Sequence, residues 1–268
     1  MPRTITAFSN PLVKQVRGLR DRKNRRREGL FVAEGLRIVA EAHEAGQVPA
    51  ILFFNGGEEI HPLLAGIIAD TEAQGGEVIE TDADILCKLS GKDNPQTVLG
   101  VYRALDTSLD GIDRAAAPLW IVAQALRDPG NLGTLLRSGD AAGAGGLILI
   151  DDCADPLSFE AVRASMGALF TQRIAAAPWS TFLSWLRAGE GMLVGTSLDA
   201  ATDYQAVAYA KPAFLLVGNE QGGLPPEYAG ACDALVKIPM LGKADSLNAA
   251  VAAAVVAYEM VNQWRRAS

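Results

Sequence analysis

Histidine and cysteine, the side chains that most often ligate transition metals, are scarce in this sequence. His43 and His61 are the only two histidines among 268 residues, and both lie in the amino-terminal third. The carboxy-terminal half therefore cannot use histidine as a general base or as a metal ligand. The three cysteines, Cys87, Cys153 and Cys232, are odd in number and far apart. We expect neither a disulfide framework nor a zinc cluster, and no bound metal.

Long apolar runs are missing as well. No run approaches the ~20 residues that a membrane-spanning helix needs. The amino terminus lacks the apolar core of a signal peptide. Hydrophobic residues make up 49% of the chain and charged residues 21%, which suffices for one large domain or two ordinary ones. We expect a soluble cytoplasmic protein that does not associate with membranes.

Positive charge is in deficit overall but concentrated at one end. The net charge is −7, yet residues 1–40 contain 10 Lys or Arg against 3 Asp or Glu. A helix is predicted to start at Ser9 or Asn10, because Pro11 follows a capping residue. Its basic face indicates an anionic partner such as RNA phosphate, although a merely solvated face is the alternative. No aromatic residue interleaves with these charges, so base stacking by this helix is not expected. The candidate RNA contacts are Lys14, Arg20, Arg25, Arg26 and Arg27.

Short apolar runs alternate with helical patterns up to residue 103, which predicts a small α/β domain over residues 1–103. Residues 104–118 lose periodicity and gain turn formers, so we place a linker there. The predicted strands of this domain are Leu30–Val32, Ala50–Phe54, Glu77–Glu80 and Val98–Tyr102, and its predicted helices are Gly35–Ala45, Pro62–Gln74 and Asp82–Leu89.

Strand and helix patterns also alternate through residues 119–268, which predicts a second domain with a largely parallel sheet buried on both faces. Its predicted strands are Leu119–Ala125, Leu147–Ile150, Met192–Thr196, Phe214–Val217 and Ala234–Ile238. Its first predicted helix follows the loop Asp128–Gly133 and ends at about Ala144. The other predicted helices are Ser158–Leu169, Trp179–Ala188 and a last one from Ser246 to about Trp264.

Three polar segments follow strands of this second domain. They are Asp128–Thr134, Gly218–Leu224, and the pair Ile238–Met240 and Ser246–Asn248. Taken singly, each has a structural explanation, because glycines permit tight turns and Ser246 or Asp245 could cap a helix. A nucleotide-binding fold is a further alternative, but the first segment lacks a third glycine and no Gly-x4-Gly-Lys-Ser/Thr loop occurs.

Together and in this order, the three segments resemble the motifs of the SpoU/TrmH family, RNA 2′-O-ribose methyltransferases of the SPOUT superfamily. Residues 8–103 are similar, less specifically, to the substrate-binding domain of many such enzymes, which resembles RNA-binding ribosomal proteins. The resemblance implies S-adenosylmethionine as cofactor, a carboxy-terminal trefoil knot, and a homodimer with its active site at the interface. The substrate would be ribosomal RNA, or less favourably transfer RNA. By motif position, the residues bordering the cofactor are Thr196, Gly218, Ile238, Met240 and Leu247.

The same resemblance assigns catalytic roles. Arg137 would contact the reacting nucleotide and is the proposed group that deprotonates the ribose hydroxyl. Asn131, Glu220, Ser246 and Asn248 would orient ribose, phosphate and cofactor. Arg137 is expected close to the amino end of its helix, where its charge is unfavourable unless an anion binds there. One position departs from the family pattern, because Ala250 replaces a serine. The alternative function is a non-catalytic RNA-binding or ribosome-assembly protein, although retention of Arg137, Glu220 and Asn248 speaks against it.

Overall fold

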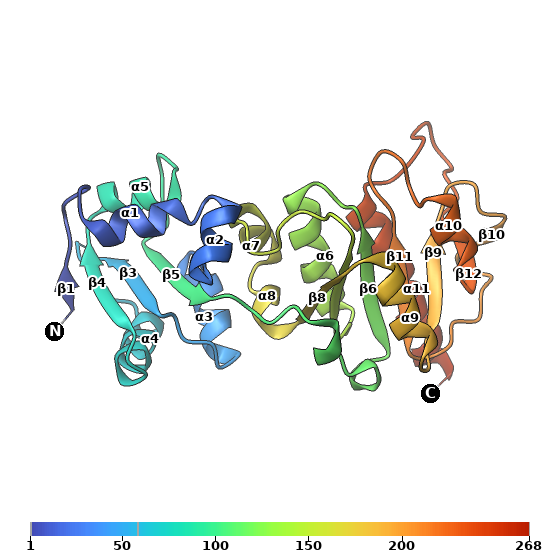
Figure 1. Cartoon of the computed structure of the whole chain (residues 1–268), viewed down its shortest axis with the longest axis horizontal. Helices are drawn as coiled ribbons and strands as arrows, with labels where there is room; N and C mark the ends of the chain where they lie inside the picture. Colours follow the sequence, from blue (N-terminus) through green and yellow to red (C-terminus); the bar gives the residue numbers. More distant parts are fainter. Residues whose placement is uncertain (1, 58, 268) are drawn as a thin grey trace. The chain divides into compact units, whose positions relative to one another are not determined.

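The computed structural model describes residues 2–57 and 59–267, which form two compact units (Figure 1). One unit comprises Met1–Leu105 together with Asp155–Thr171, and the other comprises Asp106–Ala154 together with Gln172–Ser268. The chain thus leaves the second unit after Ala154 and returns to it at Gln172. No helix in the described ranges combines the length and the apolar character required to span a bilayer.

The first unit is built on a mixed five-stranded sheet in the order β1-β4-β3-β5-β2. Its neighbours β1, β4 and β3 run parallel, whereas β5 is antiparallel to both β3 and β2. The predicted small α/β fold is confirmed, with a short first strand that the sequence did not signal. The strands are β1 (Arg3–Thr4), β2 (Leu30–Glu34), β3 (Ile51–Asn55), β4 (Glu77–Thr81) and β5 (Val98–Arg103).

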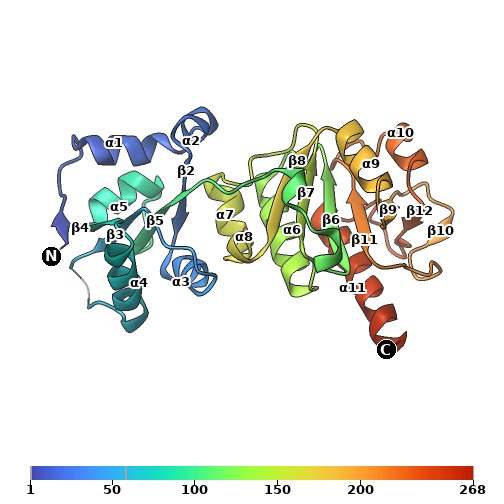
Figure 2. The same cartoon turned by 60° about the horizontal axis from the view of Figure 1, so that its bottom comes forward.

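Helices cover both faces of this sheet (Figure 2). Helices α1 (Pro11–Gly18) and α5 (Ala83–Ser90) pack through Val16 and Leu89 on a cluster that includes Phe53. Helices α3 (Leu36–Glu44) and α4 (Pro62–Ala73) cover the cluster on the other face. The basic segment predicted as one helix is divided, because a second helix, α2 (Arg22–Glu28), begins after Asp21, whose side chain caps it by accepting a hydrogen bond from Lys23 N.

A second predicted helix, Ser158–Leu169, is also divided into α7 (Phe159–Ser165) and α8 (Ala168–Thr171). Met166 and Gly167 adopt positive φ angles of 52° and 100°, which ends the first helix. The ring of Phe170 in α8 stacks on Phe31 at 5.9 Å between centroids. These helices therefore belong to the core of the first unit.

The second unit contains a seven-stranded sheet in the order β10-β12-β9-β11-β6-β7-β8. Every adjacent pair is parallel, which confirms the predicted parallel α/β fold. The predicted strands are present, and β8 and β10 are additional. Their bounds are β6 (Leu119–Gln124), β7 (Gly146–Ile150), β8 (Arg173–Ala177), β9 (Met192–Thr196), β10 (Thr202–Asp203), β11 (Ala213–Val217) and β12 (Ala234–Lys237).

Helices flank this sheet, as Figures 1 and 2 show. Helix α9 (Trp179–Arg187) buries Phe182 in one core cluster with Trp120 and Phe214. Helices α6 (Pro129–Ala141) and α11 (Ala249–Ala267) pack on each other and on central strands, and α10 (Pro226–Gly230) precedes β12. The predicted linker contains two short 3-10 turns, at Leu109–Gly111 and Arg114–Ala116.

Candidate active site

The polar segments of the second unit follow strands that are neighbours in the sheet. Strand β6 lies beside β11, β11 beside β9, and β9 beside β12. Because all four strands are parallel, the loops at their carboxyl ends emerge at one edge of the sheet. Open α/β sheets bind their ligands at this edge, where the strand order reverses. Here the order reverses between β6 and β11, since the chain builds outward to β8 and then returns to β9.

Side-chain hydrogen bonds join the three segments. The amide of Asn131 donates through Nδ2 to Oε1 of Glu220 at 3.1 Å. Asn248 donates through its own Nδ2 to Oδ1 of Asn131 at 2.8 Å. Three of the four residues predicted to orient the substrate therefore form one chain of hydrogen bonds, although they are up to 117 positions apart in sequence. We name Asn131, Glu220 and Asn248 the amide–carboxylate triad.

The carboxylate of Glu220 also contacts the backbone of the segment that leads from β6 into α6. Its two carboxylate oxygens lie 3.4 Å from the backbone nitrogens of Arg127 and Asp128, at the end of the turn that follows β6. Asp128 in turn accepts a hydrogen bond from Asn131 N at 2.8 Å and caps α6. The carboxylate of Asp128 thus occupies a backbone N–H group at the amino end of α6 that a nucleotide phosphate would need. This counts against the nucleotide-binding alternative.

Asn219 is a site residue that the sequence analysis missed. Its Nδ2 donates to the carbonyl of Ala125 at 2.7 Å, and its Oδ1 accepts from Gln221 N at 2.9 Å. Ala125 has a positive φ of 48°, an uncommon angle for a residue with a side chain. Asn219 therefore ties the Gly218–Leu224 loop to the end of β6. The available signal was the Asn-x-x-Gly spacing, which is typical of a turn closed by the asparagine side chain.

The helix that follows the third segment is capped by Asn248, so the suggested caps Ser246 and Asp245 are wrong. Asn248 Oδ1 accepts from Ala250 N at 3.0 Å and from Val251 N at 3.3 Å, and α11 begins at Ala249. One amide thus caps α11 with its oxygen and binds Asn131 with its nitrogen. Ser246 is exposed, and its hydroxyl makes no hydrogen bond within the described ranges.

Arg137 lies farther along its helix than predicted. The segment expected to be a loop, Asp128–Gly133, forms the first turns of α6, which begins at Pro129. Arg137 is about two turns beyond that end, so the expected repulsion from the helix amino terminus does not act on it. The guanidinium is exposed and forms no ion pair or hydrogen bond with residues 2–57 or 59–267. It is therefore available to an external anion.

A tyrosine of α10 ties this helix to the residue that follows β7. The hydroxyl of Tyr228 donates to Asp151 Oδ2 at 2.7 Å, and its ring stacks on Trp179 with 4.0 Å between centroids. Burial, followed by this hydrogen bond, raises the pKa of Tyr228 to about 12. The phenol consequently remains a neutral donor at physiological pH.

The basic residues predicted to bind RNA divide into two groups. Lys14, Arg26 and Arg27 are exposed on α1 and α2, and Arg20 is exposed between these helices with its Nη2 donating to the carbonyl of Leu89 at 3.0 Å. Arg25 is 5% exposed, and its Nη2 donates to Asp155 at 2.6 Å while Nη1 donates to the carbonyls of Leu19 and Arg20. All the described contacts of this guanidinium are internal. Arg25 thus stabilises the first unit, and we omit it from the surface offered to RNA.

Two family models match successive parts of the chain. The MRM3-like substrate binding domain matches residues 10–100, and the SpoU rRNA Methylase family matches residues 118–258, more than half of the chain. The chain belongs to the SpoU rRNA methylase family. The range of that second match includes residues 155–171, which pack with the first unit.

Several SpoU relatives are similar over nearly the whole chain. A 23S rRNA (uridine(2479)-2′-O)-methyltransferase of Streptomyces viridochromogenes is 33% identical over 91% of this chain and 87% of its own length. The 23S rRNA (guanosine(2553)-2′-O)-methyltransferase RlmP of Bacillus subtilis is 28% identical, covering 96% and 98%. A crystal structure of an AdoMet-bound rRNA methyltransferase from Sinorhizobium meliloti is 38% identical over 97% of each chain, with a TM-score of 0.90.

The residues expected to border the cofactor of a SpoU protein lie at the same sheet edge. Thr196 is the last residue of β9, and Gly218 follows β11. Ile238 and Met240 are half-buried in the segment after β12, whereas Leu247 is 37% exposed. Within residues 2–57 and 59–267, no backbone N–H or C=O group from Met240 to Leu247 has a hydrogen-bond partner. This combination of apolar side chains and free backbone groups fits an adenosine cofactor read by the main chain.

Proposed function

We propose that this protein transfers a methyl group from S-adenosylmethionine to a ribose 2′-hydroxyl of ribosomal RNA. The amide–carboxylate triad carries the proposal, because it unites the three segments by which the chain resembles RNA 2′-O-methyltransferases. The relatives named as 23S rRNA 2′-O-methyltransferases favour ribosomal over transfer RNA. Incubation of the purified chain with labelled S-adenosylmethionine and ribosomal RNA tests the proposal. Label should appear on a ribose oxygen, and label on a base or no transfer would contradict it.

The chemistry requires alignment of three atoms and removal of one proton. S-adenosylmethionine, when bound, supplies an electrophilic methyl group on a sulfonium. In this proposal Arg137 contacts the RNA phosphate and the ribose oxygen, where its charge stabilises negative charge that develops on that oxygen. The triad holds the loops after β6, β11 and β12 in register, so that the cofactor and the nucleotide meet in a fixed orientation. Ser246, exposed beside Asn248, is available to hydrogen-bond the substrate.

The alternative is a non-catalytic RNA-binding or ribosome-assembly protein that retains the fold. A protein that only binds RNA has no use for the combination of an exposed arginine on α6 with a fixed carboxylate and a doubly used asparagine in the loops at the strand ends. The names of the relatives also favour catalysis. A cytoplasmic location accompanies this proposal, supported by bacterial relatives that modify ribosomal RNA.

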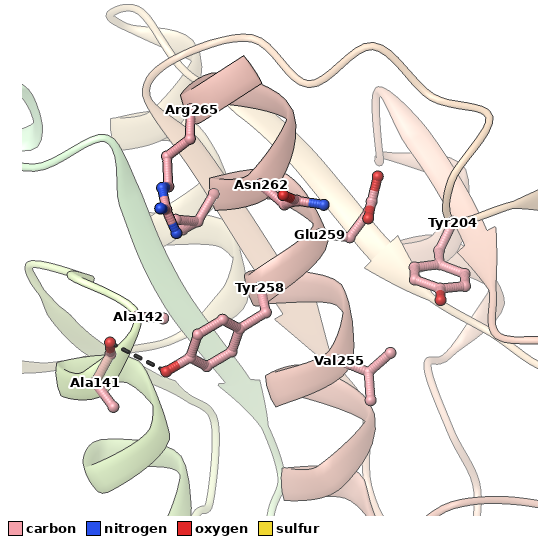
Figure 3. A pocket seen from close by; sticks show the side chains of 9 residues that line it. Ala141, Ala142, Tyr204, Val255, Tyr258, Glu259, Asn262 and Arg265 are labelled. Atoms are coloured by element: carbon pink, nitrogen blue, oxygen red, sulfur yellow. Dashed lines mark hydrogen bonds between the residues drawn. The ribbon is translucent and has the colours of Figure 1, made fainter. Parts of the chain in front are cut away.

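A second copy of the chain is the proposed partner of α11. Val251 and Tyr258 lie two turns apart on one side of this helix and are 46% and 50% exposed. A hollow of about 400 Å³ lies beside Tyr258, and Figure 3 shows Tyr258, Glu259 and Arg265 of α11 together with Tyr204 around it. Exposed apolar and aromatic side chains on one face of a helix are typical of a contact surface. The trefoil knot implied by the family resemblance remains a prediction alongside the dimer.

We predict that the protein is a homodimer and binds S-adenosylmethionine without added metal. The bordering groups are apolar side chains and backbone amides, none of which requires a cation. Calorimetry in the presence of a chelator should give the same affinity as calorimetry without it, and light scattering should give twice the mass of one chain. Loss of S-adenosylmethionine binding in the chelator would refute metal-free binding, and a monomer at all concentrations would refute the homodimer.

Charge reversal on α2 should weaken RNA binding. In the double variant Arg26→Glu, Arg27→Glu, fewer counterions are released from the RNA, so both the affinity and its salt dependence should fall. A protein with about six phosphate contacts loses on the order of a thousandfold affinity between roughly 50 and 200 mM salt. Removal of one phosphate-binding side chain lowers the salt slope by about one. Titrations of ribosomal RNA at several salt concentrations measure this.

Arg25→Ala is the matched control for that experiment. It removes one positive charge from the same helix but breaks a buried ion pair with Asp155, whose side chain is 15% exposed. Loss of one partner of such a pair costs about 3 kcal/mol of unfolding free energy. Thermal unfolding should therefore shift strongly in this variant and little in the double variant. An unchanged salt slope in the double variant would mean that the basic face is merely solvated.

A further inference from the structure

A cavity of about 320 Å³ lies within the first unit, whereas the loops of the candidate active site belong to the second. Its volume is at the lower end of the range that small-molecule sites occupy. The residues that shape it come from segments far apart in sequence and include three cations, two acids and one aromatic ring. They are Arg20, Glu34, Lys92, Phe159, Glu160 and Arg163.

One wall of the cavity is a guanidinium held in a fixed position. Arg20 Nη2 donates to the carbonyl of Leu89 at 3.0 Å. A Cβ atom at residue 91 would lie 2.0 Å from the same nitrogen, so the guanidinium can take this position because residue 91 is a glycine. The Cζ atom of Arg20 is 5.9 Å from the centroid of the Phe159 ring. A flat aromatic ring and a planar cation therefore face the same space.

The floor and the mouth of the cavity differ in their charge balance. On the floor, Glu34 is 8% exposed and accepts hydrogen bonds from Lys92 Nζ and from Gln96 N at 3.1 Å, so its charge is neutralised. At the mouth, Glu160 and Arg163 are exposed, and neither has a polar partner in the part of the chain that the structure describes. Arg163 is thus free to bind an anion at the entrance.

We propose that this cavity binds one unpaired nucleotide of the RNA substrate. The base stacks on Phe159 within the cavity, and the flanking phosphate lies against Arg163 at its mouth. Proteins recognise single-stranded RNA by unstacked bases laid on aromatic rings and arginine planes, with basic groups on the backbone. The basic helices lack an aromatic residue, which is why the sequence predicted no stacking. The fold supplies the ring from a segment 139 positions beyond Arg20.

The inference rests on the proposed function only in that RNA is the ligand. The test measures fluorescence anisotropy of the full chain with two probes, a single-stranded oligouridine of about ten nucleotides and an RNA duplex of equal length. The single strand should bind more tightly. Phe159→Leu, which keeps apolar packing but removes the ring, should weaken it about tenfold, and Phe159→Trp should not. Arg163→Ala should lower the salt slope by about one.

Two variants in the same unit serve as matched controls. Phe8 is 53% exposed and Arg37 is exposed on α3, and neither lines the cavity. Phe8→Leu and Arg37→Ala should bind the single strand as the wild type does. Uridine monophosphate, added as competitor, should displace the oligomer only weakly. Competition as strong as that of the oligomer would indicate a site for free nucleotides and would overturn the assignment to RNA.

The pocket and the proposed function can fail separately. Thermal unfolding and S-adenosylmethionine affinity should be unchanged in Phe159→Leu. Equal binding of the two probes, wild-type affinity in Phe159→Leu, or no binding of the single strand would overturn the pocket. Methyl transfer to ribosomal RNA by the wild type would still support the proposed function in each of these cases. Failure of methyl transfer with intact oligouridine binding would contradict the proposed function alone.

Discussion

Gly218→Ala is expected to abolish S-adenosylmethionine binding or weaken it at least about tenfold, and to lower the unfolding free energy by about 2–3 kcal/mol. A Cβ atom at this position would lie 2.3 Å from the carbonyl carbon of Gly223 and 2.6 Å from Leu224 N. Both atoms belong to the backbone, so no side chain can rotate away to relieve the clash. The whole Gly218–Leu224 loop, including Glu220, would have to shift. Calorimetry and chemical denaturation measure the two effects.

Gly222→Ala is the matched control, because it adds the same methyl group to the same loop. A Cβ atom at Gly222 meets nothing within 4 Å. The variant should therefore bind S-adenosylmethionine and unfold like the wild type. If both alanine variants lose affinity equally, general flexibility of the loop, not the close backbone approach, would explain the loss. If neither does, the loop does not border the cofactor.

Arg137→Ala should lose methyl transfer by at least about a hundredfold while folding, dimerising and binding S-adenosylmethionine nearly as the wild type does. The first part follows from the proposed role, since removal of one donor that stabilises a developing oxyanion has an effect of this size. The second follows from the structure, because Arg137 has no internal partner, within the described ranges, that could be left unsatisfied. Single-turnover measurements of methyl transfer test the first part, and calorimetry with S-adenosylmethionine on the same preparation tests the second.

Arg137→Lys distinguishes two roles for the guanidinium. With a pKa above about 12, arginine normally stays protonated and acts as an electrostatic clamp. It can accept the hydroxyl proton only if a nearby phosphate or carboxylate draws off its own. A clamp should keep measurable activity as lysine, whereas a bidentate or proton-relaying group should not. Near-normal transfer by the alanine variant would remove Arg137 from the catalytic mechanism altogether.

Much of the fold was predictable because apolar periodicity marks strands that are buried on both faces. β9 was predicted with its actual bounds, and β6 and β11 to within one residue. β8 was missed because Arg173–Ala177 contains only one large apolar residue, Ile174, and its alanines are equally typical of helices. The division of α7 from α8 depends on positive φ angles at Met166 and Gly167, and only the glycine is a sequence signal for that conformation.

The candidate site was predictable as a set of residues but not as a set of hydrogen bonds. Motif order indicated Asn131, Glu220 and Asn248, yet no local rule indicates that one asparagine binds another 117 positions away. The start of α6 was misplaced because Gly130 and Gly133 suggested a loop, whereas Asp128 and Pro129 form an effective cap and first turn.

Tertiary packing also determines which arginines are exposed and available to contact RNA. Arg25, Arg26 and Arg27 are three consecutive arginines, so neither residue type nor helix propensity distinguishes them. Only Arg25 faces Asp155, which comes from a segment 130 positions away. Charge patterning alone therefore predicts a basic surface without identifying the residue that is withdrawn from it. The same segment brings Phe159 to Arg20, a pairing with no local signature.

The most direct test of ribose methylation is to map 2′-O-methylated nucleotides in ribosomal RNA from cells with the gene, without it, and with the gene carrying Arg137→Ala. We predict one site that is methylated only with the wild-type gene and unmethylated in both other strains. Identical methylation maps in all three strains would contradict ribose methylation by this protein.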